Sequence, residues 1–192
     1  YHVWDNDPIP LYNKTIYESC DWVGCISKVT HKCVAGSSGI DNHSYIPHGV
    51  DVNTYCPLDE SASIKCRENI LENSCDFLIL VNNANIRRKQ LLLTMDAFDK
   101  FCSKLKSDKA HTVALLLHTN PVNSAGSNLN TIVDDLYPNR NIIFSTQVVD
   151  DETLNQMYNS ADVTINLASN EGFGLATLES LSAGTPIIVS RN

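Results

Sequence analysis

Short apolar runs alternate with amphipathic segments along most of the chain. The runs have the length of single strands, and several of them are rich in β-branched residues, which favour extended structure. Turn residues such as Gly, Pro and Asn lie between many of them. Strands are therefore expected over residues 23–26, 44–46, 77–82, 112–118, 141–145, 162–167 and 186–190.

Between these runs, apolar residues recur at the three- and four-residue spacing of a helix with one buried face. Residues 11–20 form such an amphipathic stretch, and Ser61 is a suitable N-cap for the first helix after it. Acidic residues open the segment that begins at Asp151, as the helix dipole favours. Helices are expected over residues 61–71, 90–105, 129–137, 151–158 and 174–183.

Apolar strands separated by single helices indicate an α/β fold in which a Rossmann-like parallel sheet carries helices on both faces. In such sheets, ligands bind at the carboxyl ends of the strands. The loops expected to meet at that edge cover residues 82–89, 118–127, 146–150 and 168–174.

The most linker-like stretch is AGSSGIDN, residues 35–42. We place a domain boundary there, between an incomplete first domain of residues 1–38 and a second domain of residues 39–192. The chain opens at Tyr1 and closes directly after an expected strand. These features predict a fragment of a longer, two-domain protein.

Composition excludes several classes of protein. The net charge of −8 argues against nucleic-acid binding, which selects a basic surface. No apolar run approaches the ~20 residues that a membrane span requires, and the first residues do not resemble a signal peptide. The seven cysteines include no C-x-x-C pair, which favours reduced thiols in a cytoplasmic protein. His31 and Cys33 lie close together without a second ligand pair, so no metal site is expected.

The richest chemical pattern is EGFGLATLESLSAGTPIIVS, residues 171–190. It predicts a loop, then a short helix that ends at the C′ residue Gly184, then a buried strand. Glycines ahead of a helix let an anion approach backbone N–H groups, where the helix dipole favours it. Glu171 and Glu179 could accept hydrogen bonds from hydroxyls of the same ligand. The plainer interpretation is an ordinary α/β unit with solvated glutamates.

A second pattern, Arg87-Arg88-Lys89, follows the strand expected at residues 77–82. Three cations at the carboxyl end of a strand could hold a diphosphate through charge-assisted hydrogen bonds. Alternatively, they form a solvated basic start to the next helix, although cations at a helix N-terminus oppose its dipole.

Residues 171–190 resemble the donor-site signature of retaining glycosyltransferases of family 4, the GT-B enzymes called glycosyl transferases group 1. Their motif is Glu, seven residues and Glu, with Gly-Phe-Gly between, and it is intact here. YIPHGVD, residues 45–51, resembles the turn that enters the family's donor domain, with His48 in place of Asn. A histidine in a turn is either structural or, as the alternative, a catalytic base. Residues 21–28 resemble the end of the family's first domain.

The resemblance implies a role for each residue of the signature. Glu179 accepts hydrogen bonds from the donor ribose, and Glu171 accepts them from the donor sugar. Gly172, Phe173 and Gly174 offer backbone N–H groups near the phosphates, and Leu175 is a further donor-binding residue. These residues are therefore expected to bind the donor, with Glu171 taking part in catalysis.

The same resemblance makes the cations catalytic, because Arg88 and Lys89 would stabilise the leaving nucleoside diphosphate. The family's earlier arginine has no match, since Asn83 or Ala84 occupies its place. His118, expected at the end of a strand on the ligand side, is a further candidate for a donor contact.

The function expected from the resemblance is a retaining hexosyltransferase that moves a sugar from a nucleotide-diphosphate-sugar to a sugar, glycan, lipid or protein acceptor. No cofactor or metal is expected, and the isolated fragment should be inactive. The alternatives are a non-catalytic nucleotide-binding module and a nucleotide-sugar epimerase. A dinucleotide-dependent oxidoreductase is disfavoured, because Thr177 stands where its third glycine belongs. The sequence leaves the sugar, base, acceptor and oligomeric state open.

Overall fold

The computed structural model describes residues 2–71 and 75–191 of the chain. These residues form two compact units, and each is described by itself. Unit 1 comprises residues 1–49 and 170–175, and unit 2 comprises residues 50–169 and 176–192.

Unit 1 is built on a three-stranded parallel sheet in the order β1-β2-β3. Buried Tyr17, Val23, Cys25 and Val34 form its core, so the apolar run at residues 23–26 becomes a fully buried strand, as predicted. The elements of this unit are β1 (His2–Val3), the 3-10 helix η1 (Leu11–Asn13), α1 (Lys14–Glu18), β2 (Val23–Cys25), α2 (Lys28–Ser38) and β3 (His43–Tyr45).

Helix α2 was not predicted, and the linker proposed for residues 35–42 is wrong in its first half, because α2 continues to Ser38. Ser27 caps the helix by accepting a hydrogen bond from the Thr30 N–H at 3.0 Å. The hydroxyl of Ser38 donates to the Val34 carbonyl at 2.8 Å, so a polar residue fits the last turn. Gly39, with a φ of 65°, then ends the helix. The predicted domain boundary at residues 38–39 stays a prediction.

Unit 2 contains a five-stranded sheet in the order β6-β5-β4-β7-β8, and every pair of neighbouring strands is parallel. The predicted parallel sheet with helices on both faces is confirmed. Each strand lies within one or two residues of its predicted range, because all are short apolar runs bounded by turn residues. The strands are β4 (Phe77–Asn82), β5 (Val113–His118), β6 (Ile142–Ser145), β7 (Val163–Asn166) and β8 (Ile187–Val189).

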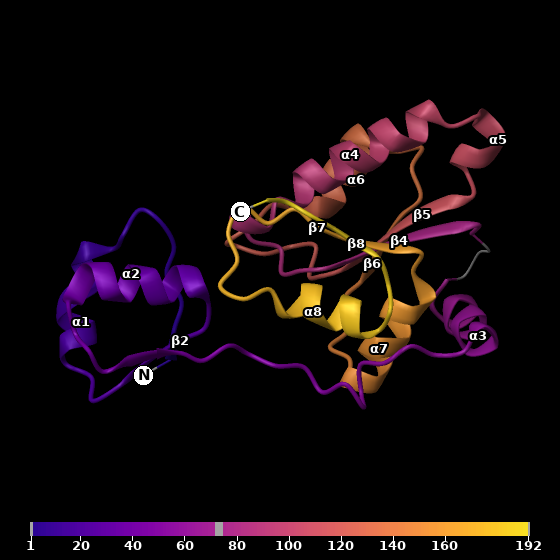
Figure 1. Cartoon of the computed structure of the whole chain (residues 1–192). Helices are drawn as coiled ribbons and strands as arrows, with labels where there is room; N and C mark the ends of the chain where they lie inside the picture. Colours follow the sequence, from indigo (N-terminus) through magenta and orange to yellow (C-terminus); the bar gives the residue numbers. More distant parts are fainter. Residues whose placement is uncertain (1, 72–74, 192) are drawn as a thin grey trace. The chain divides into compact units, whose positions relative to one another are not determined.

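Helices cover both faces of this sheet (Figure 1). Helices α4 (Leu91–Lys104) and α6 (Leu129–Leu136) lie on one face, and α7 (Asp151–Ser160) and α8 (Leu175–Ser182) lie on the other. Helix α3 (Glu60–Ile70) packs against α7. The remaining helical segments are short: the 3-10 helix η2 (Arg87–Lys89) and α5 (Ser107–Ala110).

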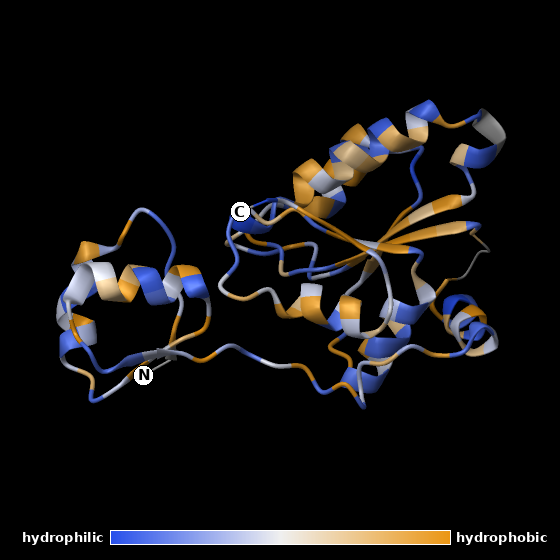
Figure 2. Ribbon diagram, in the orientation of Figure 1, coloured by the Kyte–Doolittle hydropathy of each residue, from blue (hydrophilic) through white to orange (hydrophobic). Residues whose placement is uncertain are grey.

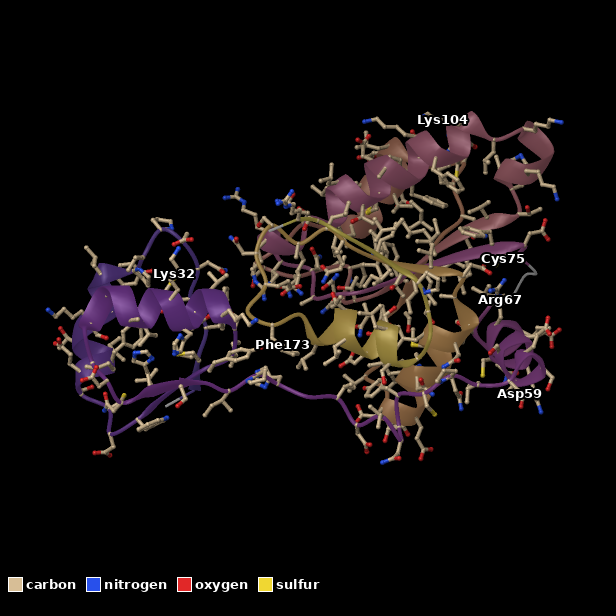
Figure 3. All side chains as sticks on the ribbon, viewed as in Figure 1. Lys32, Asp59, Arg67, Cys75, Lys104 and Phe173 are labelled. Carbon is tan, nitrogen blue, oxygen red and sulfur yellow. The ribbon has the colours of Figure 1, made fainter. Side chains whose placement is uncertain are left out.

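The two faces of β4 explain why its sequence is apolar without interruption. Leu78 and Leu80 pack into the core on the α7 side, and Ile79 and Val81 pack into the core on the α4 side. Strands β4 and β5 are accordingly hydrophobic along most of their length (Figure 2), and side chains fill the space between the sheet and its helices (Figure 3). A strand buried on both faces has no polar alternation.

The predicted N-cap of α3 is wrong by two positions. Asp59, not Ser61, caps the helix, since its carboxylate accepts hydrogen bonds from the Ala62 N–H at 2.9 Å and the Ser61 hydroxyl at 2.6 Å. A carboxylate interacts with the positive end of the helix dipole, which a hydroxyl cannot match. The helix therefore begins at Glu60.

All seven cysteines are free thiols, as the sequence predicted. Within residues 2–71 and 75–191, no helix is both long enough and apolar enough to cross a membrane.

Candidate functional site

The candidate site begins at the carboxyl edge of the unit 2 sheet, where polar residues end the apolar strands. Asn82 at the end of β4 lies beside His118 at the end of β5, which in turn lies beside Ser145 at the end of β6. The parallel register brings these positions together from three separate segments of the chain. The loops that the sequence predicted at this edge follow directly from these strands.

A hydrogen-bonded chain connects this edge to Glu179 on α8. The side-chain amide of Asn82 donates to the Tyr158 hydroxyl at 2.9 Å, and that hydroxyl donates to Glu179 Oε2 at 2.7 Å. Tyr158 lies on α7 and is fully buried. The sequence predicted Glu179 as a site residue but missed Asn82 and Tyr158, because only the tertiary structure brings the three side chains together.

Burial governs the protonation of this network. It raises the pKa of Glu179 above the usual range of a glutamate; the Tyr158 hydrogen bond opposes this rise, and the negative charge of Asp151 adds to it. Burial and the Glu179 charge raise the pKa of the Tyr158 phenol, which therefore stays protonated over the range in which proteins are folded. Tyr158 is thus a permanent donor to a partly desolvated carboxylate.

A second tyrosine lies next to this network. Tyr55 is buried, its ring centroid lies 6.3 Å from that of Tyr158, and its hydroxyl donates to Asp151 at 2.9 Å. The hydroxyl of Ser182 at the end of α8 donates to the Tyr55 carbonyl at 2.5 Å. These contacts fasten the chain around residue 55 to both α7 and α8.

The cationic pattern falls on η2, directly after β4. Arg87 is exposed, whereas Arg88 and Lys89 are half-buried. The Arg88 carbonyl accepts hydrogen bonds from the backbone N–H of Ser169 at 2.8 Å and from its hydroxyl at 3.3 Å. This fixes the cationic turn against the loop after β7, so two of the predicted ligand loops are in contact.

Where the family has its earlier arginine, this chain has Asn83 or Ala84. The Asn83 side chain is buried, with 6% of the residue exposed. The Asn83 amide donates to Asn166 Oδ1 at 3.3 Å, and the Asn166 amide donates to the Thr177 hydroxyl at 3.2 Å. Within the described part of the chain, Asn83 Oδ1 and Thr119 Oγ1 are buried without a hydrogen-bond partner. This part of the edge is therefore polar but uncharged.

The next loop is fixed by Asn85, whose amide donates to the carbonyls of Pro121 at 3.1 Å and Ser127 at 2.7 Å. Gly126 lies so close that a Cβ atom there would collide with the backbone carbonyl of Asn85. A pocket of about 510 Å³ lies between the loops that follow β4 and β5, with Arg87 in its lining.

His118 is the last residue of β5 and lies at the carboxyl edge of the sheet, as the sequence predicted. Its Nδ1 lies 3.0 Å from the Ser145 hydroxyl. Burial lowers the pKa of His118 below the usual value, so the imidazole is neutral near pH 7. A neutral imidazole can exchange hydrogen bonds with a ligand, but it adds no charge to bind a phosphate.

Residues 170–175 belong to unit 1. A Cβ atom at Gly172 would lie 2.7 Å from Trp4 Cγ and 2.9 Å from Ile26 Cδ1, so any other residue would require these side chains to move. The Phe173 ring packs edge-to-face against His48, with centroids 5.5 Å apart. Gly174 has a φ of 87°, which favours glycine at the residue before α8. The donor-binding roles expected for Glu171 and for residues 172–175 stay predictions.

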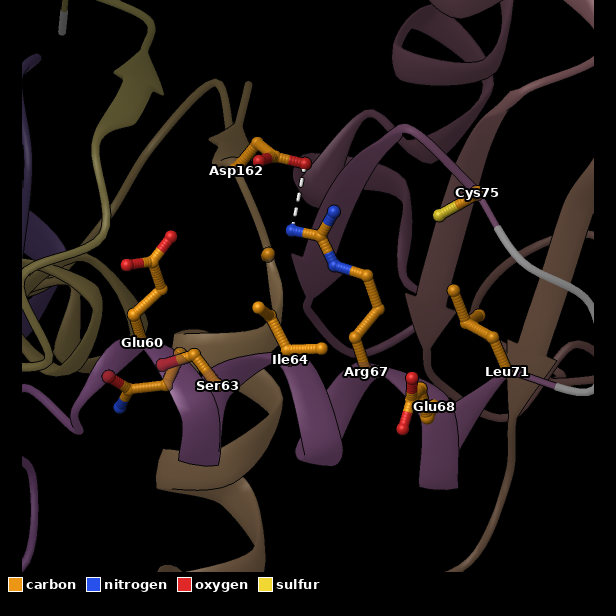
Figure 4. Close-up of a pocket in the computed structure, with 10 residues that line it drawn as sticks. Glu60, Ser63, Ile64, Arg67, Glu68, Leu71, Cys75 and Asp162 are labelled. Atoms are coloured by element: carbon orange, nitrogen blue, oxygen red, sulfur yellow. Dashed lines mark ion pairs between the residues drawn. The ribbon is translucent and has the colours of Figure 1, made fainter.

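Another pocket, of about 790 Å³, lies at the opposite, amino edge of the sheet between α3 and the start of β7 (Figure 4). Two of its charged residues serve the fold: Arg67 pairs with Asp162 at 2.9 Å and donates to the Ser160 carbonyl at 2.7 Å. Asp162 also accepts the Leu78 N–H at 2.7 Å. In the parts of the chain that the structure describes, no group of three or more His, Cys, Asp or Glu side chains could hold a metal ion.

Solved structures share this fold at low sequence identity. Anabaena Alr3699/HepE, solved in complex with UDP and glucose, is 15% identical with a TM-score of 0.75, and the match covers 98% of this chain and 51% of that one. Sucrose-phosphate synthase from Thermosynechococcus elongatus is 22% identical with a TM-score of 0.70, covering 93% and 43%. The α,α-trehalose 6-phosphate synthase of Burkholderia multivorans is 11% identical with a TM-score of 0.72, covering 98% and 50%.

The chain thus spans about half the length of these proteins. The predicted GT-B type fold is confirmed. No curated protein matches the chain by sequence. The family model described as "Glycosyl transferases group 1" matches residues 65–192, which include β4, the cationic turn and both glutamates of the signature. Because this match covers more than half of the chain, the chain belongs to the glycosyl transferases group 1 family.

Proposed function

We propose that the chain carries the donor-binding part of a retaining hexosyltransferase that takes its sugar from a nucleotide-diphosphate-sugar. The observation that carries this proposal is the setting of Glu179: a half-buried carboxylate on α8, joined through Tyr158 to the ligand edge of a parallel sheet. A partly desolvated carboxylate is an effective acceptor for hydroxyl groups. In this proposal Glu179 binds the ribose hydroxyls of the donor.

The other residues have the roles that the resemblance to the family's donor-site signature implies. Glu171 accepts hydrogen bonds from the donor sugar, and the backbone N–H groups of residues 172–175 lie near the phosphates, where the N-terminus of α8 favours an anion. When the bond between the sugar and the diphosphate breaks, negative charge accumulates on the leaving group. Arg88 and Lys89 stabilise this charge, a contribution that often dominates catalysis.

The proposal requires no metal ion, because the two cations and the backbone N–H groups supply the positive charge that a bound divalent ion would otherwise provide. It places the acceptor on residues outside the donor-binding part, so the acceptor can be a sugar, glycan, lipid or protein. We propose that the protein acts in the cytoplasm, where its seven free thiols remain reduced.

Calorimetric titration with UDP, GDP and ADP and with their sugars tests the proposal. The tightest of these nucleotides should bind the Glu179→Ala variant more weakly by about 1–3 kcal/mol, the cost of losing a charged hydrogen bond. Circular dichroism should show that the variant is folded. An unchanged dissociation constant in a folded variant would remove Glu179 from the site.

The second candidate is a nucleotide-binding module that does not transfer sugar. The uncharged Asn83 and Ala84, where the family has an arginine, favour this alternative. An intact protein that binds a nucleotide-sugar, yet neither hydrolyses it nor transfers the sugar to any of a broad set of acceptors, would support it over the transferase.

A further inference from the structure

The hydroxyl of Tyr158 lies between a donor and an acceptor that come from different elements. Asn82 at the end of β4 donates to it at 2.9 Å, and it donates to Glu179 Oε2 on α8 at 2.7 Å. Tyr158 itself has 0% exposure and belongs to the core on the α7 side. Its ring therefore cannot leave this position without disturbing the core.

The direction of the hydrogen bonds is fixed by the groups involved. A phenol has one proton, and the Asn82 amide nitrogen can only donate, so the Tyr158 oxygen accepts from Asn82 and its single proton is directed to Glu179. The Thr185 hydroxyl donates to the Tyr158 carbonyl at 2.7 Å, which holds this part of α7 in place. The result is a rigid donor aimed at one carboxylate oxygen.

We propose that Tyr158 is a positioning residue for ribose recognition: it orients the Glu179 carboxylate so that its second oxygen, Oε1, accepts hydrogen bonds from the ribose hydroxyls of the donor nucleotide. This inference rests on the role of Glu179 in the proposed function. The network also starts at Asn82, the last residue of β4, and the loop that follows it continues to the cationic turn. One set of contacts therefore supports both ends of the expected nucleotide site.

The chemistry explains why a tyrosine is suited to this role. Burial disfavours an ionised Glu179, and a neutral carboxyl group would be a weaker acceptor for hydroxyls. The Tyr158 hydrogen bond favours the ionised form. Because burial raises the pKa of the Tyr158 phenol, it keeps its proton at neutral pH and remains a donor to Glu179 there.

The test is Tyr158→Phe, which keeps the ring in the core and removes the hydroxyl. Calorimetry with UDP, GDP and ADP identifies the tightest nucleotide, which is then compared with its 2′,3′-dideoxy form. We expect Tyr158→Phe to weaken binding of the ribose form by about 10- to 150-fold, the range for a hydrogen bond to a charged group, and to leave binding of the dideoxy form unchanged. Equal loss for both forms, or no loss for either, would overturn the proposal.

Tyr55→Phe is the matched control. Tyr55 is a buried tyrosine of the same core, but its hydroxyl donates to Asp151 and not to Glu179. Its variant should show no difference between the two nucleotide forms. A ribose-dependent loss in Tyr55→Phe as large as that in Tyr158→Phe would mean that any buried hydroxyl of this core has the effect, and the proposal would fail.

A double-mutant cycle with Glu179→Ala separates the role of Tyr158 from the role of Glu179. If Tyr158 acts through Glu179, Tyr158→Phe has no effect in a Glu179→Ala background. If Glu179→Ala alone leaves ribose binding intact, the proposed function of Glu179 fails; if Glu179→Ala weakens binding and the two losses simply add, only the role of Tyr158 fails.

Asn82→Asp provides a second route should Tyr158→Phe not fold. A carboxylate at residue 82 competes with Glu179 for the single phenolic proton, with almost no change in side-chain shape. We expect the same ribose-dependent loss as in Tyr158→Phe. Full ribose discrimination in folded Asn82→Asp would contradict the proposed direction of the network.

Discussion

Several residues of the candidate site bury a charged or polar group, and this burial lowers the stability of the fold. Glu179 keeps a carboxylate in a half-buried position, and burial raises its pKa despite the hydrogen bond from Tyr158. Thr119 and Asn83 each bury an oxygen atom that has no hydrogen-bond partner among the described residues. Such exceptions to good packing concentrate at functional sites.

Glu179→Gln should therefore stabilise the protein near neutral pH. A raised pKa in the folded state means that the contribution of Glu179 to stability is fully present below its unfolded pKa and is lost as the pH rises through the folded pKa. A neutral glutamine does not undergo this loss. Urea denaturation should show a higher midpoint for the variant at about pH 7, and a much smaller gain at about pH 4. An equal gain at both pH values would show that the carboxylate charge is not the cause.

Lys89→Ala tests the cationic turn in the intact protein that contains this chain. Charge on the leaving diphosphate grows in the transition state, so this lysine should affect rate more than binding. We expect kcat to fall by at least ~10²-fold, with a much smaller loss of nucleotide affinity. Steady-state kinetics with the preferred nucleotide-sugar measure both.

Lys104→Ala is the control for the loss of one positive charge. Lys104 is exposed in the last turn of α4, at the opposite end of that helix from the cationic turn (Figure 3). It should leave kcat unchanged. If Lys89→Ala stays within about a factor of two of the unmodified enzyme, Lys89 has no catalytic role, and Arg88 becomes the next candidate.

At the level of elements, the junction between β4 and α4 contains a residue in an unfavourable backbone conformation. The cationic turn ends at Gln90, which has a φ of 54°, and α4 begins only at the next residue. The left-handed conformation costs a residue with a Cβ atom about 1–2 kcal/mol. Because Gln90 adopts this conformation instead of a helical one, the helix predicted from Gln90 starts one residue later.

Gln90→Gly should remove this strain. We expect the free energy of unfolding to rise by about 0.5–1 kcal/mol, because relief of the backbone strain exceeds the added flexibility of the unfolded chain. Chemical denaturation provides the measurement. Gln90→Ala, which retains a Cβ atom, should give no gain; a gain of the same size in Gln90→Ala would show that the glutamine side chain, not the backbone, is the cause.

At the scale of the whole molecule, the chain corresponds to about half the length of the structures it resembles. Unit 2 contains the sheet, the cationic turn and Glu179, and so carries most of the proposed nucleotide site. The proposed acceptor site lies outside this part. Binding and transfer should therefore be separable.

The 192-residue chain should bind a nucleoside diphosphate but transfer no sugar. Calorimetry measures the binding, and release of nucleoside diphosphate from the nucleotide-sugar in the presence of acceptors measures transfer. The intact protein serves as the positive control. Transfer by this chain alone would contradict the assignment of catalysis to two domains.

The sequence alone determined the alternation of strands and helices in unit 2. Its central strands β4 and β5 are buried on both faces, so each is a nearly uninterrupted apolar run, and a local pattern is sufficient to find it. The strand β8 is apolar as well, but the prediction that it is buried is wrong, because Ile188 and Val189 are exposed at the edge of the sheet. The sequence also predicted the pair Glu171 and Glu179 and the cations of residues 87–89, because residue type and spacing carry that information.

The tertiary structure decided what each of these residues contacts. Helix α2 escaped prediction because Thr30, Cys33 and Val34 are buried by partners distant in sequence, while its last residues, AGSS, read as a linker. The partners of Glu179 come from residues 82 and 158, which no spacing rule connects to residue 179. Local patterns follow from backbone geometry, which is set by neighbours in the chain; a hydrogen-bonded network depends on strand register and helix packing, which exist only in the folded protein.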